Sequence, residues 1–267
     1  MKKSICILFL FFSISIFSQL RVCSWNIENL GKSKSEKDIA YIVNVLKEYD
    51  VVALQEVVAG KGGVEAVIKI ADALNRKGSK WDYVISNPTT GSPYKTERYA
   101  FLWKTGKVKK IGKAWLEKKY EQEIDREPFF CTFNYKNKAI TIVNFHAITK
   151  SKQPETEIKY FKFLPEEYPT LNLLFVGDFN CPQSHTVFNP LKKMGYESVF
   201  KNQKTTLKRA CKEKNCLASE FDNIFYKPSL IYILKKEVVP FYKDFETLTL
   251  ARNISDHMPV YVAFEWK

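Results

Sequence analysis

The segment Val176-Gly177-Asp178-Phe179-Asn180 ends an apolar run that begins at Leu171. The run predicts a buried strand, and Asp178 and Asn180, two residues apart at its end, are expected to face the same side of a sheet. A carboxylate and a carboxamide placed together in this way can hold a hydrated cation or a phosphate group. Taken alone, the segment fits a strand followed by an ordinary Asx turn better than a binding site.

Polar side chains end several other apolar runs, and this repetition favours a shared site. Besides Asp178 and Asn180, they are Asn26, Glu56, Glu97, Arg98, His146, Asp222, Ser255, Asp256 and His257. Strands of a packed α/β core end along common edges, so these side chains can converge on one cleft. Carboxylates bind hard divalent cations, histidines transfer protons near neutral pH, and amides and arginine stabilise charge on phosphate. The set therefore predicts hydrolysis of a phosphodiester.

The hydrophobic spacing predicts alternating strands and helices. The predicted helices are residues 35–49, where Ser35 and Asp38 form a capping box, residues 64–74, a helix after Pro154, and residues 186–194. The predicted strands are 21–27, 51–54, 81–85, 99–103, 171–176, 223–225, 231–234 and 259–264, with a hairpin within 129–145. The predicted fold class is α/β, with two mixed β-sheets packed face to face and flanked by helices.

Residues 1–18 have the composition of a secretory signal peptide. Lys2 and Lys3 precede an apolar run from Ile5 to Phe17, which is shorter than the ~20 residues of a membrane helix. A retained N-terminal anchor is the alternative. We expect cleavage near Ser18, a single domain over residues 19–267, and export to the periplasm or the extracellular space.

The chain is strongly basic, with 42 Lys and Arg against 29 Asp and Glu and a formal net charge of +13. Removal of Lys2 and Lys3 with the signal would leave 13 − 2 = +11. This charge suits a polyanion such as nucleic acid or an anionic membrane surface, although charge can also serve solubility alone. The clusters 107–113 and 201–209 are the candidate contacts, and a solvated charged face explains them equally well.

Five cysteines remain after the signal. Cys211 and Cys216 flank a short polar turn and are predicted to form a disulfide, which an exported protein permits. Cys23 and Cys131 lie in apolar runs and are predicted to be buried thiols, and the odd count leaves at least one cysteine free.

Six strings of the sequence together resemble the endonuclease/exonuclease/phosphatase superfamily, and most closely its deoxyribonuclease I-like branch. In order, they are Trp25-Asn26-Ile27, Gln55-Glu56-Val57, Glu97-Arg98-Tyr99, His146, Gly177-Asp178-Phe179-Asn180 and Ser255-Asp256-His257-Met258-Pro259-Val260. The resemblance spans nearly the whole mature chain. It implies a four-layered α/β sandwich with the active site at one end.

The resemblance also implies roles for individual residues. Asn26, Glu56 and Asp256 would bind a divalent metal, Mg²⁺ in the first place and Ca²⁺ or Mn²⁺ as alternatives. His257 would be the general base, and His146, oriented by Glu97, the general acid, although the sequence leaves this assignment open. The remaining assignments are Asp178 and Asn180 on metal and phosphate, Asp222 in support of a histidine, and Arg126 and Arg98 on phosphate.

Some of these residues have simpler explanations. Asp222 could cap the next strand, and Arg126 could form a surface ion pair with Glu123 or Glu127. His185 is predicted to start a helix rather than to take part in catalysis.

Two positions depart from the deoxyribonuclease pattern. Val58 stands where the family has an arginine that enters the DNA minor groove, and the Tyr94–Tyr99 string carries one extra residue, which puts the stacking position of Tyr94 in doubt.

The predicted function is a secreted, metal-dependent endonuclease that cleaves DNA with little sequence preference, acting as a monomer without stable membrane association. A phospholipid phosphodiesterase or phosphoinositide phosphatase of the same superfamily is the alternative enzyme. A catalytically inactive binding module is the alternative of another class, against which the complete set of histidines and carboxylates argues.

Overall fold

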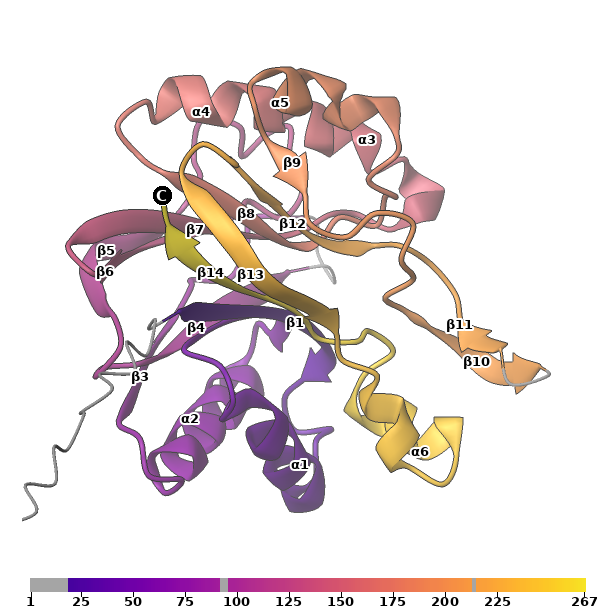
Figure 1. Cartoon of the computed structure of the whole chain (residues 1–267). Helices are drawn as coiled ribbons and strands as arrows, with labels where there is room; N and C mark the ends of the chain where they lie inside the picture. Colours follow the sequence, from indigo (N-terminus) through magenta and orange to yellow (C-terminus); the bar gives the residue numbers. More distant parts are fainter. Residues whose placement is uncertain (1–18, 92–95, 213–214) are drawn as a thin grey trace, which may run out of the picture.

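Two six-stranded mixed β-sheets pack face to face at the centre of the molecule, between two layers of helices (Figure 1). The computed structural model describes residues 19–91, 96–212 and 215–267, so the predicted signal peptide and Tyr94 lie outside the described residues. The first sheet contains, in spatial order, β13 (Ile231–Val238), β14 (Val260–Trp266), β1 (Leu20–Leu30), β2 (Val51–Val58), β4 (Glu97–Lys104) and β3 (Trp81–Ile85). The second contains β5 (Lys109–Leu116), β6 (Phe129–Tyr135), β7 (Lys138–His146), β8 (Leu173–Asp178), β12 (Asp222–Tyr226) and β9 (Glu197–Ser198). The predicted four-layered sandwich is confirmed.

The helices divide between the two outer faces. Helices α1 (Glu36–Leu46) and α2 (Lys61–Asn75) cover the first sheet, and α3 (Glu155–Ile158), α4 (Leu164–Glu167) and α5 (Asn189–Lys193) cover the second. The predicted capping box is present, because the Ser35 hydroxyl accepts a hydrogen bond from the Asp38 amide while the Asp38 carboxylate accepts one from the Ser35 amide. α1 is shorter than predicted and ends at Leu46. It buries Ile39, Ile42, Val43 and Leu46 along one stripe.

Several predicted elements differ from the structure. The helix predicted after Pro154 is a series of short turns, α3, a 3-10 helix at Lys159–Phe163 and α4, and the helix predicted at 186–194 is a 3-10 turn at Thr186–Phe188 followed by α5. Strand β5 was not predicted, since it is an edge strand with exposed lysines and so lacks an apolar pattern. Helix α6 (Leu248–Ile254) and the ribbon of β10 (Leu207–Lys212) and β11 (Asn215–Leu217) were not predicted either.

Aromatic side chains fill both interiors of the sandwich. Trp25, Tyr99, Phe101 and Phe133 are buried in the larger core, which includes the space between the two sheets. A second core, with Phe145, Phe161, Phe175, Phe179 and Phe225, packs the second sheet against its helices. Close-packed layers of this kind hold the strand ends in fixed positions.

The strand directions bring the predicted site residues to one edge. β1 runs parallel to β2, and β7 runs parallel to β8, so the C-terminal ends of all four strands can lie at the same end of the sandwich. β4 and β12 run antiparallel to these neighbours and begin at that end, with Glu97 and Asp222. The sequence resemblance implies an active site at one end of the sandwich. This is the end where β1, β2, β7 and β8 finish and where β4 and β12 begin.

The cysteines behave as the sequence predicted. Cys211 and Cys216 form a disulfide that joins β10 to β11, and the ribbon projects from the body of the molecule (Figure 1). Cys23, Cys131 and Cys181 are buried free thiols. In the part of the chain that the structure describes, no helix has the length and hydrophobicity needed to cross a membrane.

Candidate active site

Two site residues have a backbone conformation that L-amino acids rarely adopt. Glu56 lies in a β-bulge of β2 with a φ of 56°, and Asn180 follows β8 with a φ of 47°. Such left-handed residues cost of order 1–3 kcal/mol and concentrate at functional sites. Gly177 has a φ of 138°, and a Cβ at this position would lie 1.9 Å from the Phe145 carbonyl oxygen. Only glycine therefore lets β8 approach β7 closely enough to place Asp178.

Three predicted site residues form one row across neighbouring strands. His146 on β7 is paired in register with Asp178 on β8, and Asp178 is paired with Asp222 on β12. Residues paired in register project from the same face of a sheet. The sheet alone therefore brings a histidine and two carboxylates together from positions 76 residues apart in the sequence (222 − 146 = 76).

His146 is held by a buried carboxylate. Its Nδ1 lies 2.9 and 3.0 Å from the two Glu97 oxygens, and the Arg126 guanidinium lies 3.3 Å from the same carboxylate. Burial and the positive charge of Arg126 lower the pKa of His146 to about 4. Burial also raises the pKa of Glu97 to about 7, although Arg126 opposes this change.

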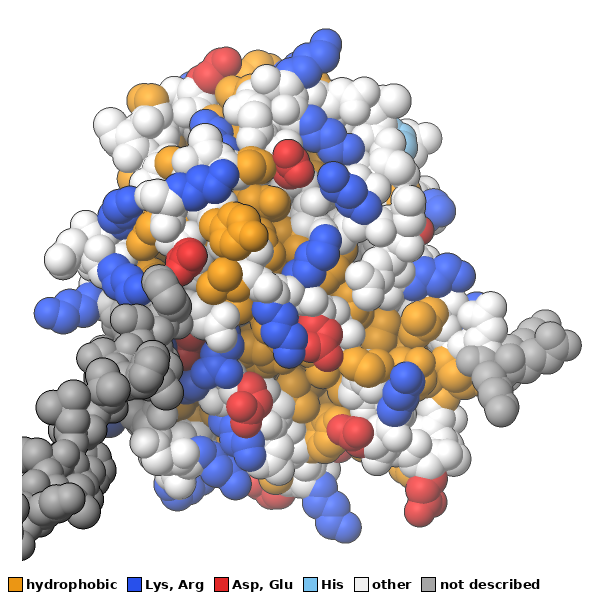
Figure 2. Space-filling view, viewed as in Figure 1, with side chains coloured by type: hydrophobic (Ala, Val, Ile, Leu, Met, Phe, Trp, Pro, Cys, Tyr) orange, Lys and Arg blue, Asp and Glu red, His pale blue; other side chains and the backbone are white. Residues whose placement is uncertain are grey.

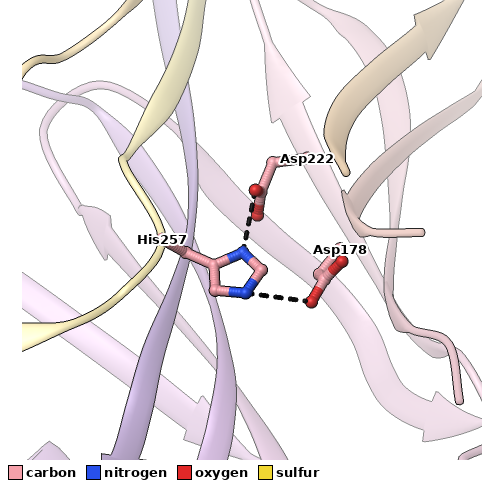
Figure 3. Close-up of side chains that lie close together, drawn as sticks. All are labelled: Asp178, Asp222 and His257. Atoms are coloured by element: carbon pink, nitrogen blue, oxygen red, sulfur yellow. Dashed lines mark hydrogen bonds and ion pairs between the residues drawn. The ribbon is translucent and has the colours of Figure 1, made fainter. Parts of the chain in front are cut away.

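His257 forms a second pair, with Asp222 (Figure 3). Its Nδ1 lies 2.8 Å from Asp222 Oδ2, and that oxygen also accepts a 2.7 Å hydrogen bond from the Thr205 hydroxyl. Burial opposes a charge on His257, but the carboxylates of Asp222 and Asp178 more than offset it and raise the pKa of His257 well above its ordinary value. The Ser255 hydroxyl accepts a hydrogen bond from the His257 amide and so fixes its loop.

Asp178 lies between the two histidines. Its Oδ2 is 3.4 Å from His146 Nε2 and 3.5 Å from His257 Nε2. The Asn180 amide donates to Asp178 Oδ1 at 2.8 Å, and the Asn26 side-chain amide donates to Asp178 Oδ2 at 3.2 Å. Burial is the main cause that raises the pKa of Asp178.

The residues predicted to bind metal offer oxygen atoms that suit a hard divalent cation. The Asn26 Oδ1 atom is buried and has no hydrogen-bond partner among the described residues, while the Asn26 amide nitrogen donates to Glu56 at 3.0 Å. A buried acceptor left unpaired beside carboxylates fits a cation ligand. Asp178, Asp222 and His257 also lie close enough together to bind an ion, but His257 Nδ1 and Asp222 already bond each other. The oxygen set around Asn26 and Glu56 is therefore the better candidate.

Asp256 lies at the rim. Its side chain is 30% exposed, its Oδ1 is 3.9 Å from His257 Nε2, and its other oxygen pairs with Arg252 at 3.3 Å. It is one of the carboxylates that raise the pKa of neighbouring Glu28, after burial, which is the larger cause. The role of Asp256 in a metal and water network stays a prediction.

The two predicted phosphate-binding arginines differ in position. Arg126 is buried, pairs with Glu97, and donates to the carbonyl oxygens of His146 and Ala147. The alternative of a surface ion pair with Glu123 or Glu127 is wrong, since Arg126 is buried and forms its ion pair with Glu97. Arg98 donates to the carbonyl oxygens of Ala59 and Ser86 and so anchors backbone.

A hollow of about 400 Å³ opens beside these groups, and Glu56, Glu97, Arg126, Val58 and Lys152 are among the residues that line it. Val58 is 38% exposed there, so the position of the family's minor-groove arginine presents an apolar side chain to the hollow. His185 lies outside the site and caps the 3-10 turn at Thr186–Phe188, as predicted.

Sequence reasoning missed three supporting residues. Thr205 bonds Asp222, the Tyr99 hydroxyl accepts a hydrogen bond from the His146 amide at 3.1 Å, and Glu157 accepts hydrogen bonds from the amides of Asp125 and Ile148. Thr205 and Glu157 lie in polar segments and carried no signal. Tyr99 could have been noticed, because it belongs to the Glu97-Arg98-Tyr99 string.

Residues 23–257 match the endonuclease/exonuclease/phosphatase family, and the chain belongs to this family. It is 28% identical to a deoxyribonuclease of Thioalkalivibrio sp. over 93% of this chain and 72% of that protein. It is also 28% identical to human deoxyribonuclease gamma, over 95% and 88% of the two chains. The solved structure of the human Nocturnin catalytic domain with bound sulfate has the same fold, with a TM-score of 0.66 and 14% identity over 93% of this chain and 95% of that one. The predicted superfamily and its deoxyribonuclease I-like branch are confirmed.

Proposed function

We propose that this protein is an exported, metal-dependent deoxyribonuclease that cleaves DNA phosphodiester bonds with little sequence preference. The observation that carries the proposal is the pair of buried histidines whose Nε2 atoms both lie within 3.5 Å of Asp178 Oδ2, each with a carboxylate on its Nδ1. Family membership makes phosphodiester hydrolysis the reaction class, and the deoxyribonuclease relatives support DNA as the substrate.

The two histidine pairs provide the two proton transfers of the reaction. One imidazole takes a proton from the attacking water, and the other gives a proton to the leaving oxygen of the DNA strand. Glu97 and Asp222 hold the rings so that both Nε2 atoms face the same point. Asn180 and Arg126 are the candidate groups for the charge that develops on the phosphate.

A divalent cation on Asn26 and Glu56 would supply charge stabilisation to the phosphate, with Mg²⁺ as the first candidate. The chain's own residues keep the carboxylate and amide oxygens of this site together, through the bond from Asn26 to Glu56 and the hydrogen bond from the Asn29 amide to Glu56 at 3.1 Å. Export is supported by the composition of residues 1–18 and by the disulfide between Cys211 and Cys216.

Nicking of supercoiled plasmid DNA tests this proposal. The mature protein with Mg²⁺ is expected to nick the plasmid, EDTA to abolish nicking, and His257→Ala to slow it by about 10²–10⁴-fold. His185→Ala is the matched control and keeps full activity, because His185 lies outside the site. A folded His257→Ala variant with unchanged nicking would contradict the proposal, as would a folded wild-type protein that cleaves lipid phosphodiesters and not DNA.

A substrate whose leaving group needs no proton can show which of the two histidines is the general acid. The sequence resemblance implies that the general acid is His146. In the metal-free protein, however, the pKa of His146 is lowered and that of His257 is raised, which favours His257 as the residue that carries the proton. A nitrophenyl phosphodiester releases an anion that needs no proton, so the variant that lacks the acid loses less activity on this substrate than on DNA. If His146→Ala shows the smaller loss, the resemblance is right. If His257→Ala shows it, the roles are reversed.

A further inference from the structure

The end of the sandwich opposite the candidate site carries a continuous group of cations. β7 runs from this end at Lys138 to the site at His146, eight residue steps or about 26 Å away at ~3.3 Å per step. The start of β1, the end of β4, the β4–β5 loop and the β6–β7 turn all lie at the same end. This end is at the left in Figure 1, beside β5 and β6, and Figure 2 shows Lys and Arg side chains along that edge.

Two hollows of about 540 and 610 Å³ open at this end and share the loop Thr105–Lys107. The cations that line them are Arg21, Lys80, Lys104, Lys107, Lys109, Lys110 and Lys136. Among the described residues that line the hollows, Asp50 is the only carboxylate. It is buried and already accepts a hydrogen bond from the Arg21 amide. The surface therefore presents a large excess of positive charge to solvent.

Several of these cations lie on strands or on a tight turn, where the backbone conformation is fixed. Lys109 pairs in register with Asn134 between β5 and β6, and the two residues of the β6–β7 turn, Lys136 and Asn137, both have positive φ, 51° and 61°. This geometry is that of a tight hairpin turn, whose twist matches the flanking strands. Lys104 is fixed further, since it pairs with Asp50 at 3.6 Å and lies over the Trp81 ring.

We propose that this surface, which we call the distal basic surface, is a second DNA-binding surface. This inference rests on the proposed function, because it takes DNA as the substrate. Duplex DNA carries one charge per ~1.7 Å of its axis, so several phosphates can meet the spread lysines at once. A membrane is the weaker partner because Ile111 is the one exposed large hydrophobic residue among the described residues that line the hollows.

The distal basic surface holds a DNA segment other than the one being cleaved. Duplex DNA is stiff, with a persistence length of about 150 base pairs, so a segment in the site does not turn back over ~26 Å to reach the opposite end. When a long DNA molecule is bound to the distal basic surface, another segment of the same molecule can enter the site. Binding at the site is then intramolecular. Long DNA is therefore cut more efficiently than short duplexes.

The test compares two triple variants of equal net charge. Lys80→Gln, Lys109→Gln and Lys136→Gln neutralise exposed lysines of the distal basic surface, while Lys159→Gln, Lys193→Gln and Lys243→Gln neutralise exposed lysines elsewhere. Each is assayed for cleavage of a duplex of about 10 base pairs and of linear plasmid DNA, and for plasmid binding in EDTA over a range of salt. Thermal unfolding confirms that both variants are folded.

We expect the distal triple variant to bind plasmid DNA about tenfold more weakly, with a salt slope smaller by about 2–3, and to cleave the short duplex as the wild type does. The proposal is overturned if plasmid binding equals that of the control triple, or if short-duplex cleavage falls in parallel, which would assign these lysines to the site itself. Loss of binding to phosphatidylglycerol vesicles without loss of DNA binding would also overturn it. Failure of the proposed function is distinct: the wild type would then leave the short duplex uncut.

Discussion

At the residue scale, Asp178 organises the site because both histidines face it. Each histidine is buried, and each is oriented by a carboxylate on Nδ1, yet their pKa values move in opposite directions. The difference lies in the neighbours, since Arg126 stands beyond Glu97 whereas Asp222 is joined by the neutral Thr205 hydroxyl. The surroundings therefore favour the neutral form of His146 and the charged form of His257.

The His146 and Glu97 pair gives the first prediction, for stability against pH in EDTA. The pKa of His146 falls from 6.5 to about 4 on folding, so its contribution is fully present above pH 6.5 and is lost as pH falls through 4. The pKa of Glu97 rises from 4.5 to about 7, so its contribution is present below pH 4.5 and is lost as pH rises through 7. The two trends oppose each other between pH 6.5 and 4.5, where both contributions change.

Each single variant should expose the trend of the residue that remains. Relative to wild type, the melting temperature of His146→Gln is expected to rise as pH is lowered from 7 to 5, and that of Glu97→Gln is expected to fall. Differential scanning calorimetry at several pH values measures both. If both variants follow the wild-type curve in parallel, the pKa of neither group changes on folding and the description of this pair is wrong.

At the scale of elements, the buried Glu157 carboxylate of α3 joins two loops of the site. Its oxygens accept hydrogen bonds from the Asp125 amide at 2.7 Å and the Ile148 amide at 2.9 Å. Arg126, next to Asp125, in turn donates to the carbonyl oxygens of His146 and Ala147. The loops after β7 and before β6 are therefore linked twice, once by Glu157 and once by Arg126.

Glu157→Gln is predicted to disturb catalysis from outside the site. An amide nitrogen cannot accept a hydrogen bond, so one backbone N–H is left unpaired at a cost of about 1–3 kcal/mol. Displacement of Arg126 and the His146 loop should reduce kcat by about tenfold, with a smaller effect on KM, because misplacement of the reacting groups slows the chemical step. Steady-state kinetics with DNA measures both constants.

Glu127→Gln is the matched control for Glu157→Gln. Glu127 is also a buried carboxylate that accepts hydrogen bonds from a backbone amide, that of Thr90, but in the described part of the chain it forms no hydrogen bond or ion pair with a candidate catalytic side chain. We expect Glu127→Gln to lower the melting temperature while kcat changes little. Equal losses of kcat in the two variants would show that Glu157 acts only through overall stability.

The elements that could be predicted from the sequence are those whose buried side chains form a clear apolar pattern. The site strands β2, β4, β7, β8 and β12 were predicted, because apolar runs that end in polar residues identify strand ends. β5 and the β10–β11 ribbon were missed because exposed strands carry lysines and no alternation, and α6 was missed because it is short. Thr205 and Glu157 could not be predicted as site residues, since their roles depend on contacts between segments far apart in the sequence.

At the scale of the whole molecule, negative charge gathers at the site and positive charge at the opposite end. Glu28, Glu56, Asp178, Asp222 and Asp256 crowd the site, and the pKa of Glu28 is raised by burial and then by Asp256 and Glu56. The carboxylates of Asp256 and Glu56 therefore repel that of Glu28 in the metal-free protein. A cation that binds between these carboxylates offsets their mutual repulsion, and because it binds only the folded state it raises the free energy of unfolding.

The last prediction is therefore that divalent cations stabilise the protein. At a concentration tenfold above its Kd, a ligand that binds only the folded state adds about 1.4 kcal/mol, which corresponds to a melting temperature higher by about 3–6 °C for a domain of this size. Glu56→Gln should remove this shift with Mg²⁺ and with Mn²⁺. In EDTA the same variant loses one of the two hydrogen bonds that Glu56 accepts from Asn26 and Asn29, while the neutral amide relieves repulsion from Glu28, so the test reads the shift that the cation adds and not the melting temperature in EDTA. Glu123→Gln, which removes an exposed carboxylate that is not among the candidate metal ligands, should keep the full shift. A Glu56→Gln variant that Mg²⁺ stabilises as strongly as wild type would place the cation elsewhere, with the Asp178, Asp222 and His257 cluster as the remaining candidate.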